Sequence, residues 1–532
     1  MASNTNVSAI LLAGGLNLSA SDQELAPGEC VELFNYEITT TGRYQRVKGF
    51  ERFSGQPAPS DARASDVPGY PALTPEQTIA GLKLLQAERR DLIMAVPGSG
   101  PVLGVFGFKG VLYAFRNTVD GSAAKLYKES VNGWVEVVTP VLQPGGYYET
   151  REANFTGSAG TMEIVGVDGK NPAFRFDGDT FTQITSIITP DAPTHLDILP
   201  SQILILSFRG GSFLYSAVGD PTKFSSVDGG GEVAVGQEIT GIEVQADATT
   251  AIFTRNRTYM FYGSSSADFQ LKALALRSGA IEKTIQSMGN SIYLDDRGLT
   301  RLDRVQQFGD FESATISQKV QPALLLRLQN VKASSVSREK NQYVLYFSDQ
   351  TALTLTQYGG EIMGYTMLRL SITPNCAWSG EDQNGKEVGF LGGDDGYVYR
   401  LESGNSFDGN AYASTLQTGF MAGGSPENKK RWRKLVVEVQ SATKIFAQHK
   451  CYYDYADPNI PLDEVILGSG SKWDLSEWDM ADWGGASTSW SDLYIDGVSR
   501  NISIYMRNES DFYPPHVMSQ MFLHASPRGR RR

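Results

Sequence analysis

Short runs of β-branched and aromatic residues, each closed by a turn rich in Asp, Asn or Gly, recur along the middle of the chain. In residues 291–302, for example, the run SIYL turns at Asp295-Asp296-Arg297-Gly298 and returns as LTRL. Asp and Gly favour the left-handed backbone that tight hairpin turns need, and β-branched and aromatic residues favour strands. This pattern therefore predicts a series of antiparallel hairpins.

Seven such hairpins lie between residues 91 and 405. They occupy residues 108–135, 162–178, 203–215, 252–262, 291–302, 343–355 and 388–401. Their spacing of roughly 40–60 residues is typical of propeller blades built from four short strands each. A β-sandwich with long loops is the alternative, but a sandwich rarely needs so many evenly spaced hairpins. We therefore expect an all-β chain in which residues 91–405 form a β-propeller of six or seven blades.

Both ends of the chain depart from this pattern. Residues 1–55 precede the hairpins as an N-terminal arm, and the proline-rich residues 56–90 are predicted to be an extended connection. After about residue 405 the spacing changes, so residues 406–532 are predicted to form a separate β domain. Convincing helical periodicity is limited to residues 316–329, where Ser317 is a candidate N-cap.

Composition narrows the compartment and the class of partner. The 532 residues carry a net charge of −12, which argues against a protein that reads nucleic-acid sequence, because phosphate contacts need clustered positive charge. Three widely separated cysteines offer neither a disulfide framework nor a zinc motif. No stretch approaches the ~18–20 apolar residues of a membrane span, and the apolar segment 7–16 lacks the basic region of a secretory signal. We expect synthesis in a cytoplasm and no membrane span.

Signatures of catalysis are weak. The four histidines show no zinc-helix spacing, and neither a G-x-S-x-G motif nor a phosphate-binding Walker loop is present. The pairs Asp295-Asp296 and Asp394-Asp395 resemble the carboxylates of a glycosidase, but both lie in predicted hairpin turns, where Asp is common. We therefore expect a protein that is not an enzyme, with no catalytic residue, no metal ligand and no cofactor.

Two features suggest interfaces. One is a series of Trp residues at five-residue steps, which is not a helical period. It favours a role in the core or at a protein interface over stacking on sugars. The other is a run with five cations in six residues, which is either a solvated turn or a contact with an acidic neighbour or with passing DNA. The interface candidates are Lys429, Lys430, Arg431, Trp432, Arg433, Lys434, Trp473, Trp478 and Trp483.

Three short sequence motifs near the N-terminus resemble those of a known family. They are GGLNLS at residues 14–19, LAPGECVELFNY at residues 25–36 and GRYQRVKGF at residues 42–50. Together they resemble the opening of the tail nozzle (tail tubular protein B-like) proteins of short-tailed bacteriophages. Residues 259–263, 291–302 and 473–484 are similar to later parts of the same family.

The resemblance implies a structural virion protein at the tail tip, assembled in the host bacterial cytoplasm. It implies a homo-hexameric nozzle that extends the portal–adaptor channel, retains packaged DNA and opens for ejection. The N-terminal arm and the C-terminal β domain would combine into a platform that docks on the tail adaptor protein, and the propeller would be a scaffold for neighbouring fibres or distal channel loops. Double-stranded DNA would pass through the ring without being read. The alternatives are a propeller-type glycan-binding receptor protein or a propeller glycoside hydrolase.

Overall fold

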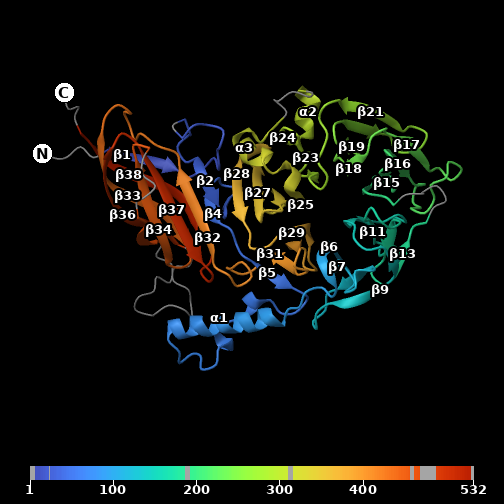
Figure 1. Cartoon of the computed structure of the whole chain (residues 1–532), viewed down its shortest axis with the longest axis horizontal. Helices are drawn as coiled ribbons and strands as arrows, with labels where there is room; N and C mark the ends of the chain where they lie inside the picture. The colour runs from blue at the N-terminus through green and yellow to red at the C-terminus, as the bar shows by residue number, and fades with distance from the viewer. Residues whose placement is uncertain are drawn as a thin grey trace.

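The computed structural model describes residues 6–22, 24–185, 192–308, 315–455, 461–467 and 487–528. These residues form two β-rich lobes that lie side by side (Figure 1). One lobe contains the consecutive sheets of the middle of the chain. The other contains strands from both chain ends, coloured blue and red in the figure.

The first lobe consists of seven small antiparallel blades, of which six are separate sheets and one is part of a larger sheet. In chain order these blades are β6–β9 (Ser99–Phe108, Val111–Asn117, Ala124–Lys128, Val135–Leu142), β10–β13 (Glu149–Ala153, Glu163–Val167, Phe174–Phe176, Phe181–Gln183), β14–β17 (Leu196–Ile198, Leu204–Phe208, Ser212–Tyr215, Gly231–Ala234), β18–β21 (Ile239–Val244, Thr250–Thr254, Thr258–Tyr262, Gln270–Ala275), β22–β24 (Gln286–Ser287, Ser291–Asp295, Gly298–Arg301), β25–β28 (Val331–Ser337, Gln342–Phe347, Thr351–Tyr358, Glu361–Arg369) and β29–β31 (Pro374–Glu381, Glu387–Gly393, Val398–Leu401) with β5 (Phe50–Phe53).

The blades close into a ring. The first strand of one blade adjoins the first strand of the next, and β29 of the last blade adjoins β6 of the first. Between the fourth and fifth blades, Gln245 Nε2 donates to Ser291 Oγ over 2.7 Å. The lobe is a seven-bladed β-propeller, which confirms the predicted fold class. Each of the seven predicted hairpins lies in a different blade. The sequence pattern marks one hairpin in each blade because it is strongest where two neighbouring strands are both buried.

The seventh blade takes its outer strand from the N-terminal arm. Strand β5 pairs antiparallel with β31, and Phe50 of β5 stacks on Phe407 with ring centroids 4.7 Å apart. Arg52 of the same strand pairs with Asp408, with Nε 2.8 Å from Oδ2. The assignment of the whole arm, residues 1–55, to the platform was therefore wrong for β5, which belongs to the propeller.

The second lobe, the platform, is a sandwich of two sheets around one hydrophobic core. The first sheet has the order β3 (Tyr36–Ile38), β4 (Tyr44–Arg46), β38 (Val517–Pro527), β33 (Lys430–Ser441) and β36 (Ser487–Ser499), with β1 (Asn6–Leu11) also paired to β38. The second contains β2 (Cys30–Phe34), β32 (Tyr412–Thr418), β37 (Ile502–Ser510), β34 (Ile445–Tyr453) and β35 (Asp463–Leu467). Both ends of the chain build the platform.

One continuous sheet joins the two lobes. Blade β25–β28 continues through β2 into β32, β37, β34 and β35, giving nine strands in a single sheet. Strand β2 supplies the junction, because Phe34 is in parallel register with Met367 of β28 and Leu33 is in antiparallel register with Leu416 of β32. The propeller and the platform therefore share backbone hydrogen bonds as well as side-chain contacts.

Helices are few and differ from the prediction. The long helix is α1 (Pro75–Leu92), which begins within the proline-rich residues expected to be an extended connection. Thr74 caps it, because its Oγ1 accepts from the Gln77 amide, and Pro75 suits the first turn. The segment 316–329 is broken into η4 (Gln318–Val320), α3 (Gln321–Leu325) and η5 (Leu328–Asn330). Its candidate cap was wrong, since Ser317 Oγ accepts from the Leu299 amide instead. Among the residues that the structure describes, the remaining helices are η1 (Pro59–Asp61), η2 (Ala64–Asp66) and α2 (Leu302–Phe308).

Candidate functional site

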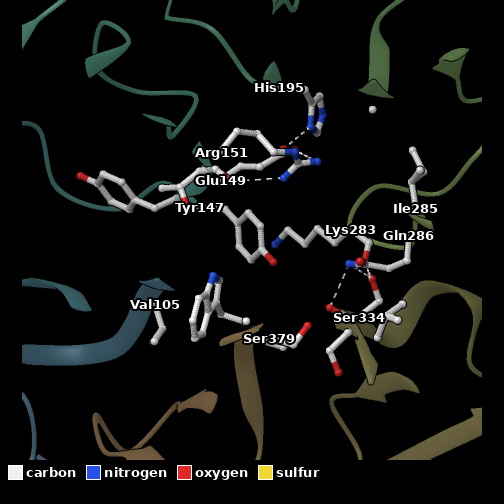
Figure 2. Close-up of a pocket in the computed structure, with 18 of the residues that line it drawn as sticks. Val105, Tyr147, Glu149, Arg151, His195, Lys283, Ile285, Gln286, Ser334 and Ser379 are labelled. Atoms are coloured by element: carbon white, nitrogen blue, oxygen red, sulfur yellow. Dashed lines mark hydrogen bonds and ion pairs between the residues drawn. The ribbon is translucent and has the colours of Figure 1, made fainter. Parts of the chain in front are cut away.

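A pocket, which we call the channel, lies in the middle of the propeller and is lined by residues of its blades (Figure 2). Its volume is about 970 Å³, and residues at the inner end of all seven blades line it. Closed propellers leave such a channel at their axis, and concave sites with convergent polar groups are where ligands bind. The channel is the principal candidate site among the described residues.

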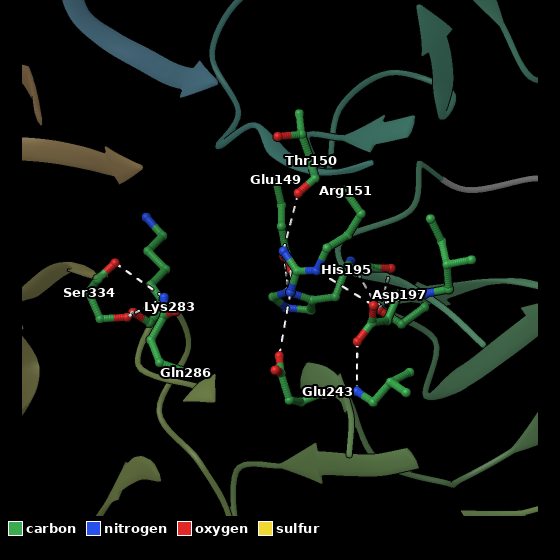
Figure 3. Close-up of polar contacts among 12 residues, drawn as sticks. Glu149, Thr150, Arg151, His195, Asp197, Glu243, Lys283, Gln286 and Ser334 are labelled. Carbon is green, nitrogen blue, oxygen red and sulfur yellow. Dashed lines mark hydrogen bonds and ion pairs between the residues drawn. The ribbon is translucent and has the colours of Figure 1, made fainter. Parts of the chain in front are cut away.

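One wall of the channel carries an ion-pair cluster, which we call the channel cluster: Glu149, Arg151, His195, Asp197 and Glu243. The guanidinium of Arg151 lies between three carboxylates, with nitrogen–oxygen distances of 3.4 Å to Glu149, 3.5 Å to Asp197 and 3.5 Å to Glu243. His195 Nδ1 lies 3.0 Å from Glu149 Oε2 (Figure 3). Because these residues come from the second, third and fourth blades, the cluster ties three neighbouring blades together.

Burial and neighbouring charges shift the pKa values of the carboxyl groups in the channel cluster in different directions. Burial raises the pKa of Glu243 to about 8, against the charge of Arg151, and the nearby Asp197 and Glu149 add to the rise. Burial likewise raises the pKa of Asp197, although Arg151 and the Val244 amide oppose it. For Glu149, burial opposes ionisation, but the hydrogen bond and charge of His195 outweigh it and lower its pKa. Glu243 is therefore the member that holds a proton at neutral pH.

The opposite wall carries a lysine without an ionic partner. Lys283 Nζ lies 4.0 Å from the centroid of the Tyr147 ring. It makes no hydrogen bond or ion pair with any residue that the structure describes. Burial lowers the pKa of Lys283, and the charge of neighbouring Glu282 only partly offsets this. Trp378 and Ser379 of the seventh blade also line the channel.

None of these channel residues is predicted as a site residue from the sequence pattern. The available signal was the alternation of charged residues along short segments, as in Glu149-Thr-Arg151 and His195-Leu-Asp197. A charged residue at a buried strand position is costly unless it is paired, so such positions point to a network. That signal becomes specific only when the strands are known to meet at one axis.

The predicted interface run lies in strand β33, and two of its members are not available at the surface. Trp432 is 0% exposed and its indole Nε1 donates to Ser499 Oγ over 2.7 Å, so its role as an exposed anchor was wrong. Lys430 is also buried, and its Nζ donates to three backbone carbonyls, of Ser425, Asn428 and Arg500. Both residues belong to the platform core because the strand alternates between its two faces.

The outer members of the run are largely paired within the chain. Arg431 pairs with Asp496 over 3.2 Å, and Lys434 pairs with Asp492 over 2.5 Å. Arg433 donates to a serine hydroxyl of β38, and Lys429 is exposed. The run is a β-strand rather than a solvated turn, and its role as an interface with another molecule stays a prediction. The candidates Trp473, Trp478 and Trp483 lie outside the described residues.

The two aspartate pairs belong to hairpin turns, as predicted. Asp295 is buried, and its Oδ1 accepts from the amides of Arg297 and Gly298. Asp395 Oδ2 accepts from the Tyr399 hydroxyl. Among the described residues, no cluster of His, Cys, Asp and Glu is arranged to hold a metal ion. Within the same residues, no helix combines the length and apolar composition that crossing a bilayer requires.

Comparisons with known proteins find similarity to solved propellers. No family model and no curated protein matches the chain. Virginiamycin B lyase from Staphylococcus aureus is 11% identical, covers 58% of this chain and 97% of its own, and has a TM-score of 0.40. The WD40 β-propeller domain of Doa1 is 10% identical, with 58% and 95% covered and a TM-score of 0.37. YCF48 bound to D1 peptide is 11% identical, with 58% and 95% covered and a TM-score of 0.36. At these values the likenesses carry no functional argument, and the fold assignment rests on the seven sheets.

Proposed function

We propose that the chain is the tail nozzle subunit of a short-tailed bacteriophage, a structural protein that forms a homo-hexameric ring, extends the portal–adaptor channel and retains DNA until ejection. The observation that carries the proposal is the nine-stranded sheet that joins the propeller to a platform formed by strands from both ends of the chain. Domains joined by ordinary interfaces move relative to one another by default. A continuous ladder of backbone hydrogen bonds makes one stiff body, which suits a ring that must hold pressurised DNA.

An exposed edge of the platform supports assembly into a ring. Among the described residues, strand β36 is the last strand of its sheet, and Trp490 and Tyr494 on it have exposed fractions of 62% and 83%. Long edge strands with exposed aromatic residues are uncommon in proteins that work as monomers, because they invite pairing with another chain. Trp and Tyr are also the residues that interfaces favour.

The test is electron microscopy of the purified full-length protein, alone and mixed with its tail adaptor protein. We expect six-fold rings with a central channel. The double variant Trp490→Asp/Tyr494→Asp should lose the rings. The matched control Val138→Asp/Val141→Asp alters two residues of β9 that are 88% and 89% exposed on the propeller, and it should still form them.

A second measurement addresses retention of DNA. Virions assembled without this chain should package DNA and then lose it, and supplying the chain should restore retention. If the protein stays monomeric with the adaptor and binds bacterial polysaccharide instead, the receptor-type alternative replaces the nozzle.

A further inference from the structure

The unpaired lysine of the propeller channel points to a ligand, independently of the nozzle proposal. Burial lowers the pKa of Lys283, so a counter-charge or hydrogen bonds from a ligand would offset the partial loss of hydration of its ammonium group. Lys283 Nζ has only the face of Tyr147, at 4.0 Å from the ring centroid, among the described residues. A cation–π contact with one ring satisfies none of the three donors of the ammonium group.

The structure holds this lysine in place through its backbone. Lys283 has φ 65°, a left-handed conformation that is uncommon for residues other than glycine. Its carbonyl oxygen accepts from Ser334 Oγ over 2.7 Å, and Gln286 Nε2 donates to the same serine oxygen over 3.1 Å. Strained backbone that its surroundings over-determine is concentrated at binding and catalytic sites. The ammonium is therefore directed into the channel by a fixed loop, as Figure 2 shows.

The residues around Lys283 favour a ligand that carries a single negative charge on an apolar body. Tyr147 and Trp378 pack against the same hydrophobic cluster and both line the channel, so the channel that Lys283 enters also offers an aromatic surface. The carboxyl groups of Glu149 and Glu243 contact Arg151 and do not pair with Lys283. Glu149, whose pKa is lowered by His195, is ionised and would repel a dianion such as phosphate more strongly than a monoanion.

We propose that the propeller channel binds a small organic carboxylate, with its carboxylate on Lys283 Nζ and its flat apolar body against Trp378. Tyr147 keeps the ammonium oriented, and Ser379 is placed to donate a further hydrogen bond from the channel wall. The channel volume of about 970 Å³ is ample for a molecule of this class.

The test uses benzoate as the probe and isothermal titration calorimetry on the full-length protein. We expect benzoate to bind, and benzyl alcohol, its neutral analogue, to bind at least about tenfold more weakly, because a charge-assisted hydrogen bond is lost. Lys283→Met should weaken benzoate binding to a similar extent. The control Lys109→Met changes another lysine of the channel, one that already donates to the Asp177 carbonyl, and should leave binding unchanged.

A second measurement covers the case in which Lys283→Met fails to fold. Acetylation of the parent protein by an N-hydroxysuccinimide ester, followed by mass spectrometry, reports whether the Lys283 amine is reactive. Benzoate should slow acetylation of Lys283 and leave that of Lys109 unchanged. Absence of benzoate binding, equal binding by Lys283→Met, or preferential binding of inorganic phosphate would overturn the proposal.

Discussion

The guanidinium of Arg46 lies 3.9 Å from the centroid of the Tyr412 ring and is completely buried. Arg46 comes from the N-terminal arm, and Tyr412 begins the C-terminal half of the platform. The guanidinium also donates to the backbone carbonyls of Tyr412, Ser510 and Tyr513. One side chain thus satisfies three carbonyl groups of the other chain end, which explains how distant segments form one core.

Replacing Arg46 should destabilise the platform. Arg46→Met leaves the three carbonyls without their donor, and an unsatisfied buried group costs about 1–3 kcal/mol. We expect the free energy of unfolding in urea to fall by about 3 kcal/mol or more. Arg46→Lys should recover little of it, because an ammonium cannot reproduce the planar fork.

The matched control is Arg43→Met. Arg43 is half-buried and makes one long hydrogen bond, 3.3 Å to the Ser519 carbonyl. We expect a loss below about 1 kcal/mol. Equal losses in the two variants would show that the buried network is not what stabilises the joint.

Closure of the seventh blade should depend on Phe50. Its ring is 1% exposed and packs on Phe407 and Tyr399. Phe50→Ala should cost about 3–5 kcal/mol, the usual range for a buried phenylalanine. The exposed Phe446 is the control, since Phe446→Ala removes a ring that is 55% exposed. Hydrogen exchange should show the loss of protection concentrated in β5 and β31.

The channel cluster makes stability depend on pH through Glu243. The raised pKa of about 8 means that the folded protein keeps this proton where the unfolded chain, with an ordinary glutamate pKa near ~4.3, has lost it. The stabilisation is therefore complete below the unfolded pKa and is lost as pH rises toward 8, by at most about 1.4 kcal/mol per pH unit. Glu243→Gln, which stays neutral, should gain stability relative to the parent between about pH 5 and pH 8.

Glu149 provides the opposite trend in the same cluster. Its pKa is lowered by His195 against the effect of burial, so its contribution is present above the unfolded pKa and lost as pH falls through the lower, folded value. Glu149→Gln should be less stable than the parent at neutral pH, with the deficit shrinking in acid. Urea titrations across this pH range measure both variants, and parallel curves for the two would contradict the assignment.

The residues of the predicted interface run, 429–434, should differ in their effect on stability, because some are buried and others lie at the surface. Trp432→Ala should cost about 3–5 kcal/mol, because the indole is fully buried. Arg431→Gln and Lys434→Gln break exposed ion pairs worth about 0.2–1 kcal/mol each and should leave the unfolding midpoint almost unchanged. A ring contact through this run would then be visible as weaker assembly of the double glutamine variant with unaltered stability. Assembly equal to that of the parent would remove the run from the list of interfaces.

The sequence predicted the propeller because the second hairpin of each blade is local and turn-rich, as in residues 291–302. It did not predict that β5 completes the seventh blade, because that pairing joins Phe50 to Leu401, far away in the chain. It did not predict α1 because the prolines of residues 56–75 are typical of an extended connection, although the last of them, Pro75, is the first residue of the helix that Thr74 caps. Trp432 shows the same limit. Which side chains of β33 are buried is determined by their alternation along the strand, and the cluster of charges in the sequence does not indicate it.

The channel residues were harder to foresee. Glu149, Asp197 and Glu243 are separated by many residues and become neighbours only around the propeller axis. Lys283 has no motif at all, because its distinguishing property is the lack of an ionic partner. Properties of this kind belong to the assembled ring rather than to any local pattern.

The outer strand of the seventh blade, β5, comes from the beginning of the chain. This origin determines when the propeller can be completed during translation. Residues 50–53 are made early, yet their partner strand, residues 398–401, emerges only after most of the protein has been synthesised. At roughly 5–20 residues per second, the wait lasts tens of seconds. Throughout that time the nascent propeller is an open arc with an unsatisfied edge, so an interrupted or truncated translation product cannot close, and only nearly finished chains present a sealed ring.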